Sequence, residues 1–315
     1  MAKVGPVTSR APQRSMSRVS TSPSRYRPED PSDYSHRFHA GNVGDVWKHC
    51  VLVEVLRRVA AIGGVVTYVE SHAGEGAYAL GPTGEWTEGI GRLWAEGVGA
   101  GEARDGEGTV VTRYVALCRA LGAGTTRPER YPGSPALARA VLGASATLAL
   151  WERDPVACER LIAASGEPAT TRVICGDGLV ALADAVGATE PEADTVVALI
   201  DPPFTQKPDW TIIPDALIAA ATASRHATVL LWYPVKSLTR PNAMIALLKS
   251  AGVSATVAEL ITTPLEHQRQ RLNGSGVVLV RPPAGHLEAI AAAAPILGAC
   301  CATRPGVWSL RLASW

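Results

Sequence analysis

Apolar residues recur at helical spacing near the start of the chain. In the segment HAGNVGDVWKHCVLVEVLRRVAA, residues 39–61, apolar side chains return every three or four positions from Val46 to Val59. This periodicity predicts an amphipathic helix. Asn42 and Asp45 precede its apolar part, and either side chain is suited to cap the first turn.

Six further runs are apolar without alternation, which is typical of strands covered on both faces. Stretches rich in Ala and Leu, at 154–165 and 214–224, lie between them and have the composition of helices. Strands that alternate with helices predict an α/β fold with a doubly wound, mostly parallel sheet. The predicted strands cover residues 63–70, 146–152, 171–175, 195–201, 227–235 and 274–283.

The interval between Gly76 and Ala146 is too long for a single connection. Loops between strands and helices in such folds take only about 2 to 6 residues. We therefore expect a small helical subdomain at about residues 82–130, inserted in a domain that spans residues 32–315.

The composition is that of a soluble globular protein. Of the 315 residues, 47% are hydrophobic and 19% are charged. No apolar run approaches the roughly 18 residues of a membrane span. The six cysteines are scattered, with neither a C-x-x-C pair nor a zinc-binding pattern. We expect a cytoplasmic monomer with reduced thiols, without a metal and without membrane contact.

The first 28 residues contain six Lys and Arg and no acid. Such a composition cannot bury apolar surface, and it predicts a disordered basic tail over residues 1–31. The tail has three interpretations: a solvated extension, an arm that contacts nucleic-acid phosphates, or a stretch upstream of a true start at Met16. No amphipathic helix of the transit-peptide kind is present in the pattern.

The first predicted strand ends in an acid followed by two glycines. The string ESHAGEG contains Glu70, Gly74 and Gly76. Glycine permits positive φ and a close approach of the backbone to a ligand. Dinucleotide-binding loops have a third glycine, and their acid comes after the loop. The order found here therefore argues against a pyrophosphate ligand.

Three more predicted strands also end in acids. Glu152 is placed to accept both hydroxyls of a ribose, and Asp177, just before Gly178, to accept from an exocyclic amine such as that of adenine. Asp201 ends the run VVALID and is followed by two prolines and Phe204. Open α/β sheets bind ligands at the carboxyl ends of their strands, so the four acids together predict one site. Each acid alone is equally well explained as a helix cap.

The order of these motifs resembles that of S-adenosylmethionine-dependent methyltransferases, whose first loop reads acid-x-x-x-G-x-G. The string DPPF resembles the [D/N/S]-P-P-[Y/F/W] motif of enzymes that methylate exocyclic amines of bases. YSHRFHAGNVGDVWKH, SHAGEG, YPGSP, WYPV and GSGVVLVRPP together resemble the bacterial 23S ribosomal RNA adenine-N6 methyltransferases of the RlmJ family, from Tyr34 to Trp315. The resemblance implies a Rossmann-like methyltransferase fold and methylation of adenine 2030 of 23S ribosomal RNA.

The resemblance also implies which residues act. Asp201 is implied to be catalytic, and Tyr34 to contact the RNA, with His36 beside it in the same segment. Lys48 and Gly74 join the cofactor set for their own chemistry, because an ammonium suits a phosphate or carboxylate and a glycine lets a ligand approach. The residues implied to contact S-adenosyl-L-methionine are His49, His72, Ser134, Glu152, Asp177, Gly178 and Asp201.

Asp201 and Pro202 suggest a mechanism. An exocyclic amine of adenine is a poor nucleophile because its lone pair is delocalised into the ring. If Asp201 and the Pro202 carbonyl each accept one N6 proton, the lone pair is oriented, and such orientation contributes about 7 kcal/mol or more. Phe204 offers a stacking face for an extruded adenine. Trp232 and Tyr233 are either core or a second stacking face.

Two features depart from the family pattern: Glu70, where aspartate is commoner, and the additional basic tail. DPPF does not specify its substrate, so a DNA or small-molecule amino-methyltransferase is one alternative. A non-catalytic RNA-binding relative is another. The intact Asp-Pro-Pro string argues against the non-catalytic relative, and the lack of an added DNA-recognition domain argues against the DNA enzyme.

Overall fold

The computed structural model describes residues 36–98, 108–165, 169–188, 194–266 and 272–315. The basic tail expected at residues 1–31 lies outside this part of the chain. The described residues belong to one compact unit that spans Ser35–Trp315. None of the helices in this part of the chain is both long and apolar enough to cross a membrane.

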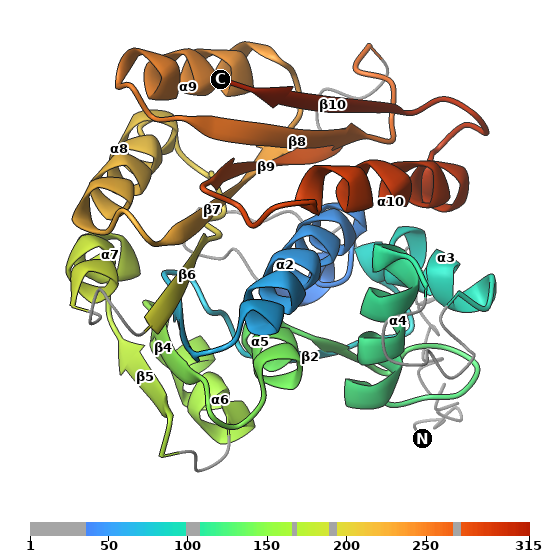
Figure 1. Ribbon diagram of the computed structural model, residues 1–315. Helices are drawn as coiled ribbons and strands as arrows, with labels where there is room; N and C mark the ends of the chain where they lie inside the picture. Colours follow the sequence, from blue (N-terminus) through green and yellow to red (C-terminus); the bar gives the residue numbers. More distant parts are fainter. Residues whose placement is uncertain (1–35, 99–107, 166–168, 189–193, 267–271) are drawn as a thin grey trace, which may run out of the picture. The chain divides into compact units, whose positions relative to one another are not determined.

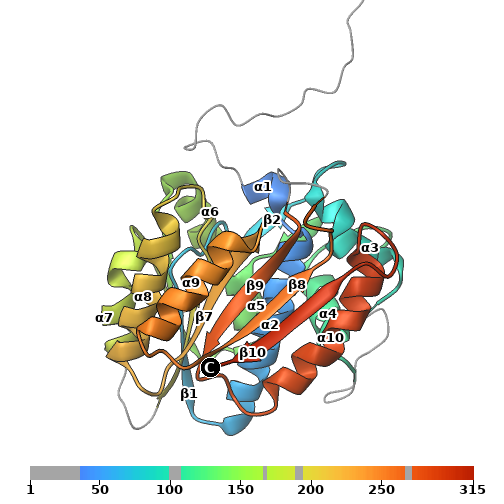
Figure 2. The same cartoon turned by 90° about the horizontal axis from the view of Figure 1, so that it is seen from above.

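One large sheet runs through the unit in the order β10-β8-β9-β7-β6-β1-β4-β5 (Figures 1 and 2). The strands from β5 to β7 are parallel, which confirms the doubly wound, mostly parallel sheet, whereas β9, β8 and β10 pair antiparallel. A second sheet pairs β2 with β3. The strands are β1 (Val65–Glu70), β2 (Ala77–Ala79), β3 (Arg130–Pro132), β4 (Thr147–Glu152), β5 (Thr171–Cys175), β6 (Asp194–Ile200), β7 (Thr228–Val235), β8 (Ala255–Ile261), β9 (Gly274–Val280) and β10 (Ser309–Ser314).

Helices cover both faces of the large sheet (Figure 1). α2, α4, α5 and α10 pack together on one face, and α7, α8 and α9 pack in a row on the other. The helices are α1 (His36–His39), α2 (Val43–Ile62), the 3-10 helix η2 (Glu85–Glu88), α3 (Ile90–Ala95), α4 (Val110–Leu121), α5 (Ser134–Leu142), α6 (Pro155–Ser165), α7 (Gly178–Gly187), α8 (Asp209–Ala223), α9 (Thr239–Ser250) and α10 (His286–Cys301).

Strand β6 explains why its sequence does not alternate. Val197 and Leu199 belong to the core under α2, and Val196, Ala198 and Ile200 belong to the core under α7 and α8. All five side chains are buried, because helices cover the strand from both sides. In the strand order β6 lies between β7 and β1, so Asp201, the next residue, follows a central strand.

The segment at 82–130 contains η2, α3 and α4. Ile90, Leu93 and Tyr114 from this segment are fully buried in the same core as α2. Helix α4 packs on α2 and α10, and α3 packs on α10. The segment thus contributes to the main core of the domain.

The expectation that all cysteines are reduced thiols is wrong. Cys158 on α6 and Cys175 at the end of β5 form a disulfide, with their Cα atoms 5.7 Å apart. No C-x-x-C pattern marks this pair, because the two residues are 17 positions apart and meet only when α6 packs on β5. Cys50, Cys118, Cys300 and Cys301 are free thiols.

Candidate active site

The four acids predicted at strand ends lie on neighbouring strands. Glu70 ends β1, Glu152 ends β4, Asp177 follows β5, and Asp201 follows β6. Spatially these strands run β5-β4-β1-β6. The chain leaves β1 toward β4 and β5 and then returns to β6 on the other side of β1. The order of the strands therefore reverses beside β1, which is where such sheets bind ligands.

The glycine loop after β1, residues 71–76, is held from several directions. The Ser71 N–H donates to the Leu199 carbonyl at 3.1 Å, and the Ala73 N–H donates to the Trp151 carbonyl at 2.8 Å, so the loop lies across β6 and β4. Gly74 has φ of +61°, and a Cβ atom there would collide with the hydroxyl of Tyr78. Only glycine fits this backbone without strain.

Glu152 supports this loop and still has acceptor capacity. Its Oε2 accepts the Gly74 N–H at 2.8 Å, and its Oε1 accepts the Asp154 N–H at 2.8 Å. A carboxylate has about four acceptor positions, so each oxygen can accept one more proton. The half-buried Glu152 therefore has room for the two hydroxyls of a ribose, the role predicted for it.

Asp177 and Gly178 form the start of α7. The Asp177 side chain caps the helix by accepting the Leu179 N–H at 3.0 Å, and it is exposed. Gly178 is buried, and a Cβ atom there would collide with the Ser71 carbonyl. This close approach packs α7 against the glycine loop, so the chain after β5 lies directly beside the chain after β1.

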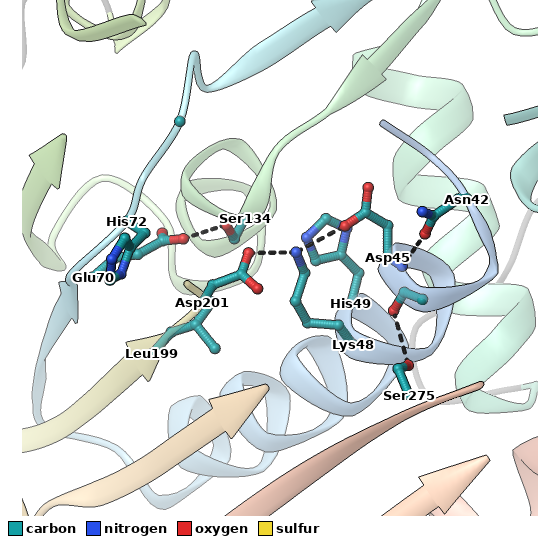
Figure 3. A network of polar contacts seen from close by, with 12 residues as sticks. Asn42, Asp45, Lys48, His49, Glu70, His72, Ser134, Leu199, Asp201 and Ser275 are labelled. Carbon is teal, nitrogen blue, oxygen red and sulfur yellow. Dashed lines mark hydrogen bonds and ion pairs between the residues drawn. The ribbon is translucent and has the colours of Figure 1, made fainter. Parts of the chain in front are cut away.

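Asp201 is joined to helix α2 by a buried lysine (Figure 3). Lys48 Nζ lies 2.5 Å from Asp201 Oδ2 and 2.8 Å from Asp45 Oδ1. The exposed fractions of the side chains are 4% for Lys48, 5% for Asp45 and 14% for Asp201. Asn42 caps α2 by accepting the Asp45 N–H at 2.9 Å. The cap predicted from the sequence thus fixes the turn that carries this network.

The charge of Lys48 is stabilised by its partners. Burial acts to lower the pKa of Lys48, but attraction to Asp201 and Asp45, with hydrogen bonds to both, outweighs burial and raises the pKa above its ordinary value. The ammonium group therefore stays charged. It fixes the Oδ2 side of the Asp201 carboxylate at the end of β6.

Glu70 is buried, with no exposed surface. Tyr68 donates to its Oε2 at 2.8 Å. Ser134 donates to its Oε1 (Figure 3). Burial raises the pKa of Glu70 to about 8, and repulsion from Asp201 adds to this, while both hydrogen bonds oppose it. Glu70 is therefore largely protonated at neutral pH. The hydroxyl of Ser134, expected to contact the cofactor, is directed at Glu70.

The two predicted histidines have different environments. His49 is 2% exposed, its Nδ1 lies 2.7 Å from the hydroxyl of Tyr131, and the two rings stack. The Tyr131 hydroxyl in turn lies 2.8 Å from the Tyr114 hydroxyl, within hydrogen-bonding distance. His72 is half-buried, with Nδ1 2.8 Å from Ser71 Oγ. Burial lowers the pKa of His72 to about 4, so it is neutral at physiological pH.

After Asp201, Pro202 and Phe204 are buried, whereas Pro203 between them is exposed. Phe204 has φ of +49°, which is unusual for a residue with a side chain, and it is 8% exposed. Its ring packs on Trp210 with the centroids 4.5 Å apart. Among the described residues, no backbone N–H donates to the carbonyl of Pro202. Pro202 is itself buried.

The two aromatic residues of WYPV differ. Tyr233 is fully buried, and its hydroxyl donates to Glu259 at 2.9 Å, so it belongs to the core. Trp232 is half-buried, and the ammonium of Lys48 lies 5.7 Å from its ring centroid. Trp232 thus flanks the lysine that contacts Asp201.

Two predicted RNA contacts are only partly covered by the structure. Tyr34 lies outside the described residues, and His36 is the first residue of α1. Within the described ranges, no group of three or more His, Cys, Asp or Glu side chains is arranged to hold a metal ion.

Comparison with known proteins decides the family. Residues 64–314 match the family model described as "Ribosomal RNA large subunit methyltransferase D, RlmJ". The chain belongs to this family. It is 30% identical over 257 residues to ribosomal RNA large subunit methyltransferase J of Haemophilus influenzae. The aligned region covers 79% of this chain and 87% of that protein. The Escherichia coli protein of the same name is 29% identical over 256 residues, with the same coverage.

A solved structure agrees with this membership. Protein LPL1258 of Legionella pneumophila superposes with a TM-score of 0.75 at 25% identity, covering 88% of this chain and 98% of that one. The order of the sheet and the family match together confirm the Rossmann-like methyltransferase fold. S-adenosyl-L-methionine is likewise confirmed as the cofactor that goes with this family. The glycine loop, the open acceptor positions of Glu152 and the exposed Asp177 fit a nucleoside of this kind.

Sequence reasoning did not find several residues of the site. Asp45 was considered only as a cap, although its spacing of three from Lys48 on a helix signals an ion pair. Tyr68, Tyr78 and Tyr131, which hold Glu70, the glycine loop and His49, gave no signal. These tyrosines act through contacts with distant segments of the chain, or through side chains that point inward from a strand.

Proposed function

We propose that the protein methylates the exocyclic N6 amine of an adenine in 23S ribosomal RNA, with S-adenosyl-L-methionine as methyl donor. By family resemblance the target is adenine 2030. The observation that carries the proposal is the Asp201 carboxylate, fixed by Lys48 at the end of β6 and next to the Pro202 carbonyl. Family membership supports action on ribosomal RNA.

Asp201 orients the amine and takes its proton. Its Oδ2 faces Lys48, whereas no described residue donates to Oδ1, which is therefore available to one N6–H. The Pro202 carbonyl accepts the other N6–H, so that the nitrogen lone pair is directed at the transferred methyl group. Bound S-adenosyl-L-methionine supplies that methyl group as an electrophile. The amine becomes acidic as it gains positive charge, so Asp201 needs no raised basicity.

The backbone around Asp201 keeps the acceptors in place. The two prolines have fixed φ, and Phe204 holds an uncommon backbone conformation against Trp210. An adenine in a duplex has its amine paired, so the target is single-stranded or flipped. The stacking surface for that base is the ring of Phe204, of which 8% is exposed, or that of the half-buried Trp232.

The remaining strand ends bind the cofactor in this proposal. Glu152 takes the ribose hydroxyls, and Asp177 takes the adenine amine, with Gly178 and Gly74 allowing close approach. Lys48, His49, His72 and Ser134 complete the wall near the methionine part. Tyr34 and His36 contact the RNA, and the protein acts as a monomer in the cytoplasm.

A substrate panel tests this function. Transfer of labelled methyl from S-adenosyl-L-methionine is measured on 23S RNA, 16S RNA, duplex DNA and free nucleosides, and the modified base is identified by mass spectrometry. The proposal requires label on adenine of 23S RNA as N6-methyladenine. Label on DNA alone, or on cytosine, would overturn it in favour of a DNA or other amino-methyltransferase. No transfer to any substrate, with intact cofactor binding, would indicate a non-catalytic relative.

A further inference from the structure

Arg37 on α1 is bonded to Glu75 in the glycine loop. The Arg37 Nε lies 2.9 Å from Glu75 Oε1 and 3.1 Å from Oε2, and a terminal nitrogen lies 3.0 Å from Oε2. Arg160 on α6 donates to the same Oε1 at 2.8 Å. Glu75 lies between the two glycines of the loop, so this one carboxylate joins α1, α6 and the expected cofactor loop.

The contact between Arg37 and Glu75 differs from an ordinary surface ion pair in its burial and in its geometry. The Glu75 side chain is 12% exposed, whereas those of Arg37 and Arg160 are 49% and 44% exposed. Both guanidinium groups therefore cover an acid that is largely enclosed. Arg37 uses the paired, fork-like geometry that a planar guanidinium makes with a carboxylate, which a lysine cannot reproduce.

The glycine loop is the fixed partner in this contact. The Glu75 N–H donates to the hydroxyl of Tyr78 at 3.1 Å, and the neighbouring Gly74 N–H donates to Glu152. Helix α1, by contrast, has only four residues. A single turn is not stable by itself, because nucleation of a helix costs more than its first hydrogen bonds return. The position of α1 therefore depends on contacts with its surroundings.

Two side-chain contacts hold the end of α1. His39 Nδ1 lies 2.9 Å from Glu85 on η2, and the Asn42 side chain donates to the same Glu85 oxygen at 2.9 Å. The chain then continues into α2, where the Gly41 N–H donates to Asp45 at 2.9 Å. Because Asp45 contacts Lys48, α1 connects the glycine loop to the network at Asp201.

We propose that Arg37 is a positioning residue, and that its pair with Glu75 holds α1 against the glycine loop as the RNA-facing wall of the site. Tyr34, the expected RNA contact, precedes Arg37 by only three positions in the sequence. Without the pair, α1 leaves the loop, and RNA binds more weakly while the cofactor site persists. This inference rests on the proposed action on RNA.

A direct contact of Arg37 with RNA phosphate is the competing explanation, and four variants separate the two. Arg37→Ala removes the pair and the charge. Arg37→Lys keeps the positive charge and loses the paired hydrogen bonds of the guanidinium group. Glu75→Gln keeps Arg37 and its charge and removes the anion. Arg160→Ala is the matched control, because it takes one arginine from Glu75 without touching α1.

The first measurement is steady-state methyl transfer, with KM for RNA and Kd for S-adenosyl-L-methionine determined for each full-length variant. We expect KM for RNA to rise about three- to tenfold in Arg37→Ala, Arg37→Lys and Glu75→Gln, the range for a paired ionic contact. Arg160→Ala should stay within about twofold of the wild type. Kd for the cofactor should change less than about twofold throughout.

The second measurement is hydrogen exchange of the peptide that covers residues 36–42, which needs no turnover. Arg37→Ala and Glu75→Gln should lose protection there, and Arg160→Ala should keep it. An unchanged or lower KM in Glu75→Gln would overturn the proposal in favour of direct phosphate contact. Unchanged exchange in all variants would also overturn it. If the wild type methylates no RNA, the proposed function fails, whereas the exchange result still decides whether Arg37 positions α1.

Discussion

Lys48 on α2 and Asp201 after β6 are 153 positions apart in sequence, and their side chains meet with Nζ 2.5 Å from Oδ2. Asp45 completes the contact from one turn before Lys48. One helix thus sets the orientation of the carboxylate at the end of the central strand. This relationship brings α2 to the candidate active site and gives the buried lysine its two acidic partners.

Replacement of this lysine should destabilise the fold. Lys48→Met removes a buried cation that contacts both Asp45 and Asp201, and breaking a buried pair typically costs about 3 to 5 kcal/mol. Because Asp201 is partly exposed, we expect the lower end, about 3 kcal/mol, in urea denaturation. Lys236→Met, at an exposed position after β7, is the control and should change stability by less than about 0.5 kcal/mol. Equal effects of the two substitutions would contradict the role given to the buried network.

The neutral state of Glu70 predicts a pH dependence of stability. Its pKa is about 8 in the folded protein and near the ordinary 4.5 in the unfolded chain. Between these values the folded protein holds a proton that the unfolded chain has released. The stability due to Glu70 is therefore fully present below pH 4.5 and is lost as the pH rises through about 8.

Glu70→Gln removes this dependence. The stability difference between wild type and variant should shift against the wild type by up to about 1.4 kcal/mol per pH unit in this window. Taking the difference cancels His72, whose lowered pKa acts with the opposite sign below pH 6.5. Denaturant titrations of both proteins at pH 5, 6, 7 and 8 measure this difference in the free energy of unfolding. A difference that stays constant over this range would show that Glu70 is ionised in the folded protein.

Two glycines near the same strand end provide a matched pair. Gly178→Ala forces a methyl group into the Ser71 carbonyl, whereas a Cβ atom at Gly176 meets nothing within 4 Å. We expect Gly178→Ala to lose about 1 to 3 kcal/mol of stability and to weaken cofactor binding as the two loops separate. Gly176→Ala should be neutral or slightly stabilising. Calorimetric titration with S-adenosyl-L-methionine and thermal unfolding test both, and similar behaviour of the two variants would argue against the close approach.

The disulfide between Cys158 and Cys175 predicts a thiol count and a stability loss. Denatured protein without reductant should react at four of its six cysteines, namely those that remain free. Reduction, or Cys158→Ser with Cys175→Ser, should cost about 3 kcal/mol, the value for a closed loop of this size. Thiol titration and denaturation with and without dithiothreitol provide the test. Six reactive thiols before reduction would contradict the pairing.

The sequence predicted most of the sheet because its central strands are buried on both faces. Six predicted strands match β1, β4, β5, β6, β7 and β9. Strand β10 was missed because it lies at the sheet edge and its side chains are half-buried or exposed, so its apolar signal is weak. Strand β8 was missed although it is buried, because its run contains Glu259, which pairs with Tyr233 only in the folded protein.

The candidate site divides in the same way. Acids and glycines at strand ends were visible because the carboxyl edge of a parallel sheet gathers them. The partners of those acids could not be predicted from the sequence, since Lys48 reaches Asp201 and Ser134 reaches Glu70 from distant segments. The neutral state of Glu70 follows from its complete burial, which no local pattern reveals.

The role of Asp201 is the central claim, and the substitution Asp201→Ala tests it most directly because it removes the acceptor. Single-turnover methyl transfer to 23S RNA and calorimetric titration of S-adenosyl-L-methionine are measured on the same preparations, with the product nucleoside identified by mass spectrometry. We predict N6-methyladenine from the wild type, a loss of transfer of about 10³-fold in the variant, and a cofactor Kd within about threefold. Parallel losses of transfer and cofactor affinity, or a wild-type product other than N6-methyladenine, would contradict the account.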